Sequence, residues 1–173
     1  MSSRLTQARR AVWDAIDNWP GLANTFRQKF RFESEPQDRA APEASHRPDA
    51  PSGHTDLPAI AILPGTVTPR WASNLQQDHP YTLTIRYWTA GRCVDRSEAI
   101  WDEIIKAVHR AKPAENLDID TYIKEGTGYA IPAGYGPSRM SFVKLGRDQK
   151  LDATLHEFSL VLRMKINPRT GTL

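Results

Sequence analysis

The chain has 173 residues, of which 39% are hydrophobic and 25% charged, as expected for one globular domain over residues 1–173. Its net charge of +3 is too small to require a nucleic-acid partner, and its single cysteine excludes an internal disulfide. No apolar run is long enough for a transmembrane helix, and the first ten residues lack the apolar stretch of a signal peptide. We therefore expect a chain that folds in a reducing cytosol, without a membrane partner.

The N-terminal part predicts a helix and then a strand. Residues 3–19 carry an apolar stripe at helical spacing, which Pro20 and Gly21 end, and Trp13 lies at the margin of that stripe. Residues 26–33 alternate strictly and predict a strand with one apolar and one basic face. The basic face either is solvated and protects a sheet edge, or meets an acidic partner or a phosphate backbone. It consists of Arg27, Lys29 and Arg31.

Residues 34–56 differ in composition from the rest of the chain. They contain four prolines and no Val, Ile, Leu, Phe, Trp or Tyr, so they cannot bury enough apolar surface to offset their ordering entropy. Five acidic and two basic residues give the segment a net charge of −3. We predict a Pro-rich extended loop that lies outside the core and orders on a partner.

The middle of the chain predicts two strands and a second helix. Residues 57–63 are an apolar run bounded by prolines, compatible with a strand in which Pro58 marks either a sheet edge or the strand start, and residues 66–80 form a polar connection. Residues 81–88 alternate as a half-buried strand. Asp95 and Glu98 then have capping-box spacing, and an apolar stripe continues to residue 108. A strand feeding an amphipathic helix is the core of a layered fold of sheet and helices.

The C-terminal part predicts further strands around an irregular segment. Residues 117–123 and 140–145 suggest short strands, and residues 158–166 alternate along the longest strand. Residues 125–138 hold four glycines and two prolines, which predicts a Gly-rich loop, and residues 168–173 predict a loose tail. The expected fold class is α+β, with a mainly antiparallel sheet of about five to six strands, two helices packed on one face, and long loops.

The residues with reactive side chains do not form a known catalytic or metal-binding pattern. The five histidines have no metal-ligand spacing with Cys93 or with each other, and Cys93, expected to be small and semi-buried, has no partner that indicates a nucleophile. Asp118 and Asp120 share a face if extended, but solvation explains them better than acid–base chemistry. We therefore expect no catalytic residue, no metal and no cofactor, and the chain is not expected to be an enzyme.

Aromatic residues outside the assigned core faces are the other candidates. Trp13, Trp71 and Trp88 fall off those faces or at their margin, and two tyrosines lie in the Gly-rich segment. Tryptophan and tyrosine are enriched at protein interfaces, although irregular packing within the monomer explains their placement equally well. The candidate interface residues are Arg27, Lys29, Arg31, Glu35, Asp38, Trp71, Trp88, Tyr129 and Tyr135.

The order of these segments resembles a known family. A helix with Val12, Trp13 and Ile16 before Trp19 and Pro20 is followed by the strand at 26–32, the long loop, and the strand at 57–63. The strand at 81–88 and the helix at 95–108 complete the pattern. Together they resemble small tail-terminator, tail-completion or neck proteins of tailed bacteriophages.

The resemblance implies a structural virion protein without catalysis. Such a protein forms a homo-oligomeric ring, six-fold by expectation, that terminates the tail tube and joins it to the head connector. Its partners are the tail tube protein and a head-completion or connector protein, and DNA at most passes through the ring lumen. Assembly takes place in the host cytoplasm.

Two alternatives stay open at this point. The chain could be another head–tail connector or a minor tail protein. It could instead be a nucleic-acid-binding module that uses Arg27, Lys29 and Arg31. For a ring, the strand at 158–166 is expected to leave a sheet edge free for a neighbour, and the basic strand face could meet the acidic loop of the next subunit.

Overall fold

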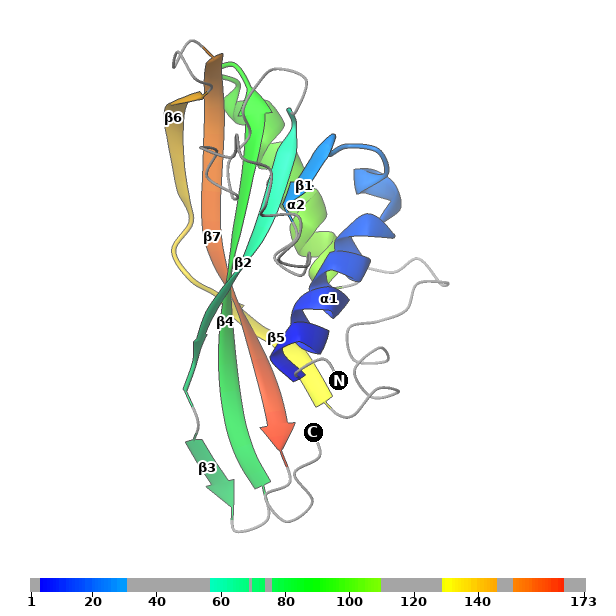
Figure 1. Ribbon diagram of the computed structural model, residues 1–173, viewed down its shortest axis with the longest axis vertical. Helices are drawn as coiled ribbons and strands as arrows, with labels where there is room; N and C mark the ends of the chain where they lie inside the picture. Colours follow the sequence, from blue (N-terminus) through cyan, green and yellow to red (C-terminus); the bar gives the residue numbers. More distant parts are fainter. Residues whose placement is uncertain are drawn as a thin grey trace, which may run out of the picture.

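A computed structural model describes residues 4–30, 57–68, 70–73, 76–109, 129–145 and 151–166. In these ranges the chain forms two α-helices, one short 3-10 helix and seven strands (Figure 1). The predicted loop at 34–56, the strand at 117–123 and the tail at 168–173 lie outside the described residues. The elements are α1 (Arg4–Asp17), η1 (Pro20–Leu22), β1 (Gln28–Phe30), β2 (Ala59–Val67), β3 (Arg70–Ser73), β4 (Gln76–Ala90), α2 (Val94–His109), β5 (Tyr129–Tyr135), β6 (Arg139–Leu145) and β7 (Leu151–Ile166).

The seven described strands form one sheet in the order β1-β2-β4-β7-β5, with β3 also paired to β4 and β6 also paired to β7. Only the pair β1–β2 is parallel; all other pairs are antiparallel. Both α-helices lie on the same face of this sheet (Figure 1). The predicted α+β class, with a mainly antiparallel sheet and two helices on one face, is therefore confirmed.

Alternation along β4 and β7 separates the two faces of the sheet. On the face toward the helices, β4 places Tyr81, Leu83, Ile85 and Tyr87, all of them fully buried. Successive strand residues point to opposite faces, so one residue in two can join this core. The other strands and the helices complete it with Ile60, Ile62, Phe158, Leu160, Leu162, Val12, Trp13, Ile16, Ile100, Ile104 and Val108.

The opposite face carries a second, smaller apolar cluster. Trp88 of β4 is 4% exposed. Its cross-strand neighbours are Ala59 of β2 on one side and Leu155 of β7 on the other. The alanines of β2 leave room for the indole ring, which is why a large side chain fits on this face. The buried members of the cluster are Leu57, Ala59, Ala61, Trp88, Leu151 and Ala153.

One end of the sheet continues beyond the helices. The pairing of β4 with β7 runs without a break from Ala90 and Ala153 to Gln77 and Ile166. At its far end, β3 pairs with β4 on one side and β5 pairs with β7 on the other. Figure 1 shows β3 and the ends of β4 and β7 projecting below α1, with β5 beside the lower end of that helix. We call this part of the sheet, made of β3, residues 76–80, residues 163–166 and residues 129–131, the arm.

Several sequence-based expectations are corrected by the strands. The Gly-rich segment 125–138 is not an irregular loop throughout, because β5 occupies Tyr129–Tyr135. Pro132 is tolerated because β7 is the one strand in the described ranges with which β5 pairs, and the register shift between Pro132 and Gly134 marks an irregularity of the kind that glycine permits. The supposed polar connection 66–80 contains the end of β2, all of β3 and the start of β4.

The strand at 158–166 is not a sheet edge. Within the described residues, β7 pairs with β4 along one side and with β5 and β6 along the other. It begins at Leu151, earlier than predicted, and forms the centre of the sheet. The described edges belong instead to β1, β3, β5 and β6, each of which is paired on one side only.

The second helix starts one residue before the predicted cap. It begins at Val94, and the amide of Ser97 donates to the carbonyl of Cys93 at 3.4 Å, so Asp95 lies inside the first turn. Cys93, expected to be semi-buried, is exposed in the turn before the helix.

Candidate functional site

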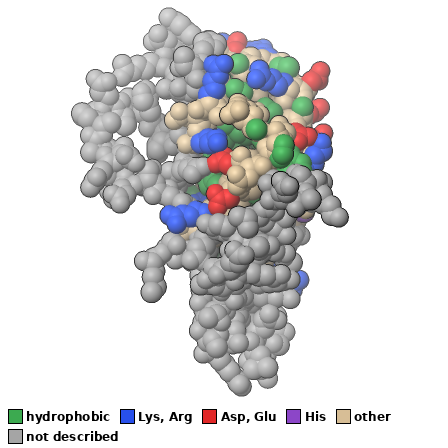
Figure 2. All heavy atoms as spheres, turned by 90° about the vertical axis from the view of Figure 1, so that its right-hand side faces the viewer, with side chains coloured by type: hydrophobic (Ala, Val, Ile, Leu, Met, Phe, Trp, Pro, Cys, Tyr) green, Lys and Arg blue, Asp and Glu red, His purple; other side chains and the backbone are tan. Residues whose placement is uncertain are grey.

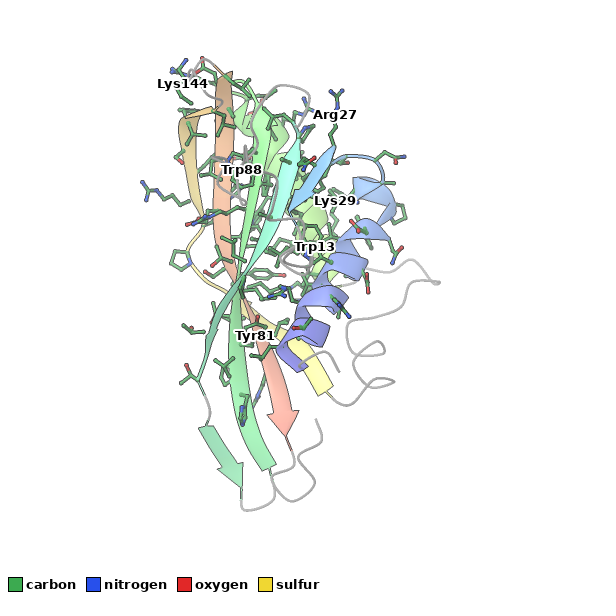
Figure 3. The ribbon with its side chains drawn as sticks, in the orientation of Figure 1. Trp13, Arg27, Lys29, Tyr81, Trp88 and Lys144 are labelled. Carbon is green, nitrogen blue, oxygen red and sulfur yellow. The ribbon has the colours of Figure 1, made fainter. Side chains whose placement is uncertain are left out.

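The predicted interface tryptophans behave as core residues wherever their side chains are described. Trp88 belongs to the second apolar cluster, and Trp13 is 2% exposed between α1 and the sheet (Figure 3). Packing within the monomer, one of the two explanations that the sequence leaves open, therefore accounts for both rings. The apolar stripe of α1 is wider than the sequence indicated, and the second face of the sheet has an apolar cluster of its own.

The predicted basic strand face is divided by the fold. Arg27 is exposed, and its amide donates to the carbonyl of Pro58 at 2.8 Å (Figure 3). Lys29 lies opposite Ile60 in the register of β1 and β2, and its Nζ is 2.7 Å from Oδ1 of Asp17 at the end of α1. Arg31, Glu35 and Asp38 lie outside the described residues. The ion pair partly neutralises Lys29, which lowers the positive charge available to a phosphate backbone.

The arm carries two of the predicted interface positions, one on each of its edge strands. Trp71 is in β3 opposite Gln77, and Gln77 is opposite Ile166 of β7. Tyr129 is in β5 opposite Lys165, the neighbour of Ile166. The side chains of these aromatic residues lie outside the described part, but their backbones stand at the two edges of the arm.

Tyr135, at the end of β5, is packed within the chain. Its half-buried ring meets His109 edge-on at 5.3 Å between centroids and lies 6.1 Å from Phe158. Burial raises the pKa of its phenol above the usual range, so the hydroxyl stays protonated at neutral pH. The tyrosine helps to attach β5 to the helix layer, a role within one subunit.

A chain of polar groups crosses the helix-facing side of the sheet. Tyr87 of β4 donates its hydroxyl to the carbonyl of Ser97 in α2 at 2.6 Å. The Tyr87 oxygen is 2.5 Å from Nδ1 of His156 in β7, and Nε2 of His156 is hydrogen-bonded to the hydroxyl of Ser138. We call these four residues, Ser138, His156, Tyr87 and Ser97, the polar chain. It links β7, β4, α2 and the connection between β5 and β6.

His156 is the buried titratable group of this chain. It is 4% exposed, and its burial lowers the pKa of the imidazole below the ordinary value of 6.5. Burial also raises the pKa of Tyr87, with smaller effects from Asp102 and Glu98 on α2. Both groups are therefore neutral at pH 7.

Sequence reasoning assigned His156 no role. The signal that could have found it is its place in the alternation of β7, at an inward position two residues before the buried Phe158. A histidine on an apolar strand face needs hydrogen-bond partners, because burying an unpaired polar group costs free energy. Its partners come from segments far away in the sequence.

No group of three or more His, Cys, Asp and Glu side chains within the described ranges is arranged to hold a metal ion. Neither α1 nor α2 is long and apolar enough to cross a membrane. Comparison with known proteins finds no family model and no curated protein that matches this chain.

Proposed function

We propose that the chain is a structural protein of a tailed bacteriophage, which assembles as a ring at the head–tail junction. Six copies are expected to close the ring, which terminates the tail tube and joins it to the connector. The observation that carries the proposal is the arm, together with the resemblance in element order described above. The arm extends the sheet beyond the helices and is well placed to reach a neighbouring subunit (Figure 1).

The lengths of the elements support this role for the arm. At about 3.3 Å per residue, the 15 residues of β4 span about 50 Å. At 1.5 Å per residue, the 16 residues of α2 span about 24 Å. The helices are therefore about half as long as the sheet, and the ends of β4 and β7 extend beyond α1 (Figure 1).

The sheet edges support a contact that repeats around a ring. The edges at β3 and β5 lie on opposite sides of the arm, so one subunit can offer one edge and accept the other. Such head-to-tail contacts close into a ring when the rotation between neighbours divides a full turn. Backbone hydrogen bonds between edges supply affinity, and alternate side chains supply specificity.

Charge has a smaller part in this assembly. Lys, Arg, Asp and Glu side chains are interspersed on the outer side of the helix layer (Figure 2). Exposed ion pairs contribute about 0.2–1 kcal/mol each, so charge would set the register while apolar burial supplies most of the affinity.

The decisive experiment is to image the particles that contain this chain. Phage carrying an affinity tag on the chain would be purified and examined by cryo-electron microscopy, with the tag-free phage as the control. We expect a closed ring of identical subunits on the tail axis, between the tube and the connector. A single copy, or density away from the tail axis, would rule the ring out.

Mass measurement of the purified chain complements the imaging. Free protein can stay monomeric, because rings of this kind can form only on their template. A chain that stays monomeric after incubation with purified tail tubes, and does not bind their ends, would contradict the proposal.

A further inference from the structure

The polar chain fixes the tautomer of His156. The carbonyl of Ser97 can only accept, so the 2.6 Å hydrogen bond uses the single proton of the Tyr87 hydroxyl. The Tyr87 oxygen must then accept from Nδ1 of His156 across their 2.5 Å contact. Because burial keeps the imidazole neutral, Nε2 carries the lone pair and accepts the hydroxyl proton of Ser138.

Aromatic rings hold the imidazole in this orientation. The Trp101 ring is stacked on that of His156, with centroids 6.3 Å apart and planes 18° from parallel. Tyr87 and Phe158 flank it at 5.1 Å and 6.0 Å. A base that is fixed by its neighbours loses little entropy when it takes a proton in a reaction.

Ser138 is exposed, although its partner is buried. It stands in the connection between β5 and β6, where the Gly136 amide donates to the carbonyl of Ser159 at 2.8 Å. A Cβ on Gly136 would lie 3.0 Å from the Cβ of Ser159, so a side chain there would push the connection away from β7. The glycine keeps Ser138, an exposed residue, within hydrogen-bonding reach of His156.

We propose that Ser138 is a reactive serine, activated by His156 as general base, that accepts an acyl group from small activated carboxylic esters. The Ser138 oxygen forms a bond to the carbonyl carbon while its proton moves to Nε2 of His156. The ester C–O bond then breaks, and the departing alcohol or phenol takes that proton from Nε2. Ser138 ends as an ester, His156 returns to its neutral form, and no other reactant is needed.

Tyr87 is a positioning residue in this scheme. Its oxygen holds the Nδ1 proton of His156, so the lone pair stays on the nitrogen that faces Ser138. The same orienting role is played by the third member of hydrolase triads. This chemistry belongs to one chain and does not depend on the proposed ring.

The experiment uses p-nitrophenyl acetate with the full chain carrying Cys93→Ala, because the exposed cysteine would react as well. We expect release of one equivalent of p-nitrophenol per chain and an acetyl group on Ser138. Trypsin would liberate residues 125–139 as one peptide, in which Ser138 is the only serine. Fragment masses would separate Ser138 from the threonine and the two tyrosines of that peptide.

Three variants in the Cys93→Ala chain test the assigned roles. Ser138→Ala should abolish the modification, and His156→Gln should slow it by about 100-fold or more, the usual contribution of a general base. Tyr87→Phe keeps the ring and should slow it by a smaller factor, about 10-fold. The matched control is Ser141→Ala, a half-buried serine of β6, which should leave the rate unchanged.

Circular dichroism would confirm that each variant is folded. If His156→Gln does not fold, the acylation rate of the Tyr87→Phe chain still tests the role of His156 as general base. Absence of an adduct on Ser138 in the Cys93→Ala chain would overturn the proposal, whatever the variants do. If the folded Tyr87→Phe and His156→Gln variants form the adduct as fast as the Cys93→Ala chain does, the role of His156 is overturned.

Discussion

Strands β4 and β7 present two different surfaces to the two faces of the sheet. Toward the helices, Leu83 and Ile85 are fully buried in a continuous core. On the opposite face, the neighbour of Trp88 along β4 is Arg86, two residues earlier, which forms an ion pair with Glu157 of β7. The helix-facing side is thus apolar over a long stretch, while the opposite side changes from apolar to charged within one cross-strand row.

The two faces therefore contribute to stability in different ways. The helix-facing core depends on many large side chains, whereas the second cluster depends on one large ring among alanines and two leucines. Substitutions on the two faces should therefore lower the free energy of unfolding by different amounts.

The largest effect is expected for Trp88→Ala. Removing a buried indole typically destabilises a core by about 3–5 kcal/mol, because the transfer energy is lost and a cavity remains. Urea denaturation of the purified chain measures this loss. If Trp88 instead served only a partner surface, the free energy of unfolding would change by about 0.5 kcal/mol or less.

The next effect is expected for Leu83→Ala, on the helix-facing side of the same strand. The leucine is fully buried, so the free energy of unfolding should fall by about 2–5 kcal/mol. Thr84→Ala is the matched control, since Thr84 is only half-buried on the opposite face, and its effect should stay near 0.5 kcal/mol. Equal effects at the two positions would remove the distinction between the faces.

A pH-dependent effect is expected from His156. Its folded-state pKa is lowered by burial, so below pH 6.5 the unfolded chain binds more protons than the folded chain. Stability from this group is present above pH 6.5 and is lost as the pH falls toward the folded-state pKa. Comparing urea denaturation of wild type and His156→Gln between pH 5 and 8 isolates the histidine, because Glu98 and Asp102 are common to both chains. Parallel pH profiles would contradict the prediction.

The smallest effect is expected from the ion pair of Arg86 and Glu157. Their side chains are 31% and 35% exposed, so water screens much of the attraction. A double-mutant cycle with Arg86→Ala and Glu157→Ala should give a coupling of about 0.2–1 kcal/mol that shrinks with added salt. A coupling above about 2 kcal/mol, unaffected by salt, would mean that this part of the opposite face is covered as well.

The sequence predicted the parts of the fold that depend on local periodicity. Alternation identified the centre of β4 and most of β7, and the apolar stripes identified α1 and α2. Periodicity could not show which strands pair, so the long strand was wrongly placed at a sheet edge. Pro132 and Gly134 suit an edge strand with an irregular register, but the same residue types are typical of loops, and β5 was missed.

The candidate sites were harder to predict than the fold. Alternation cannot show whether the second face of a sheet is covered, so the sequence alone leaves Trp88 as a candidate interface residue. The partners of His156 are 18 and 69 residues away in sequence, at Ser138 and Tyr87, so their contact depends on the complete sheet. The Lys29 ion pair likewise required knowing that α1 ends beside β1.

The central place of β7 has a consequence for the order of events during translation. This strand pairs with β4, β5 and β6, all of which precede it in the chain. A nascent polypeptide that has not yet been synthesised past residue 151 therefore has three strands without their common neighbour. Their unpaired backbone groups are then exposed to other chains on the same polysome. The central pairings of the sheet can form only once residues 151–166 have left the ribosome, so until then β4, β5 and β6 stay open to aggregation.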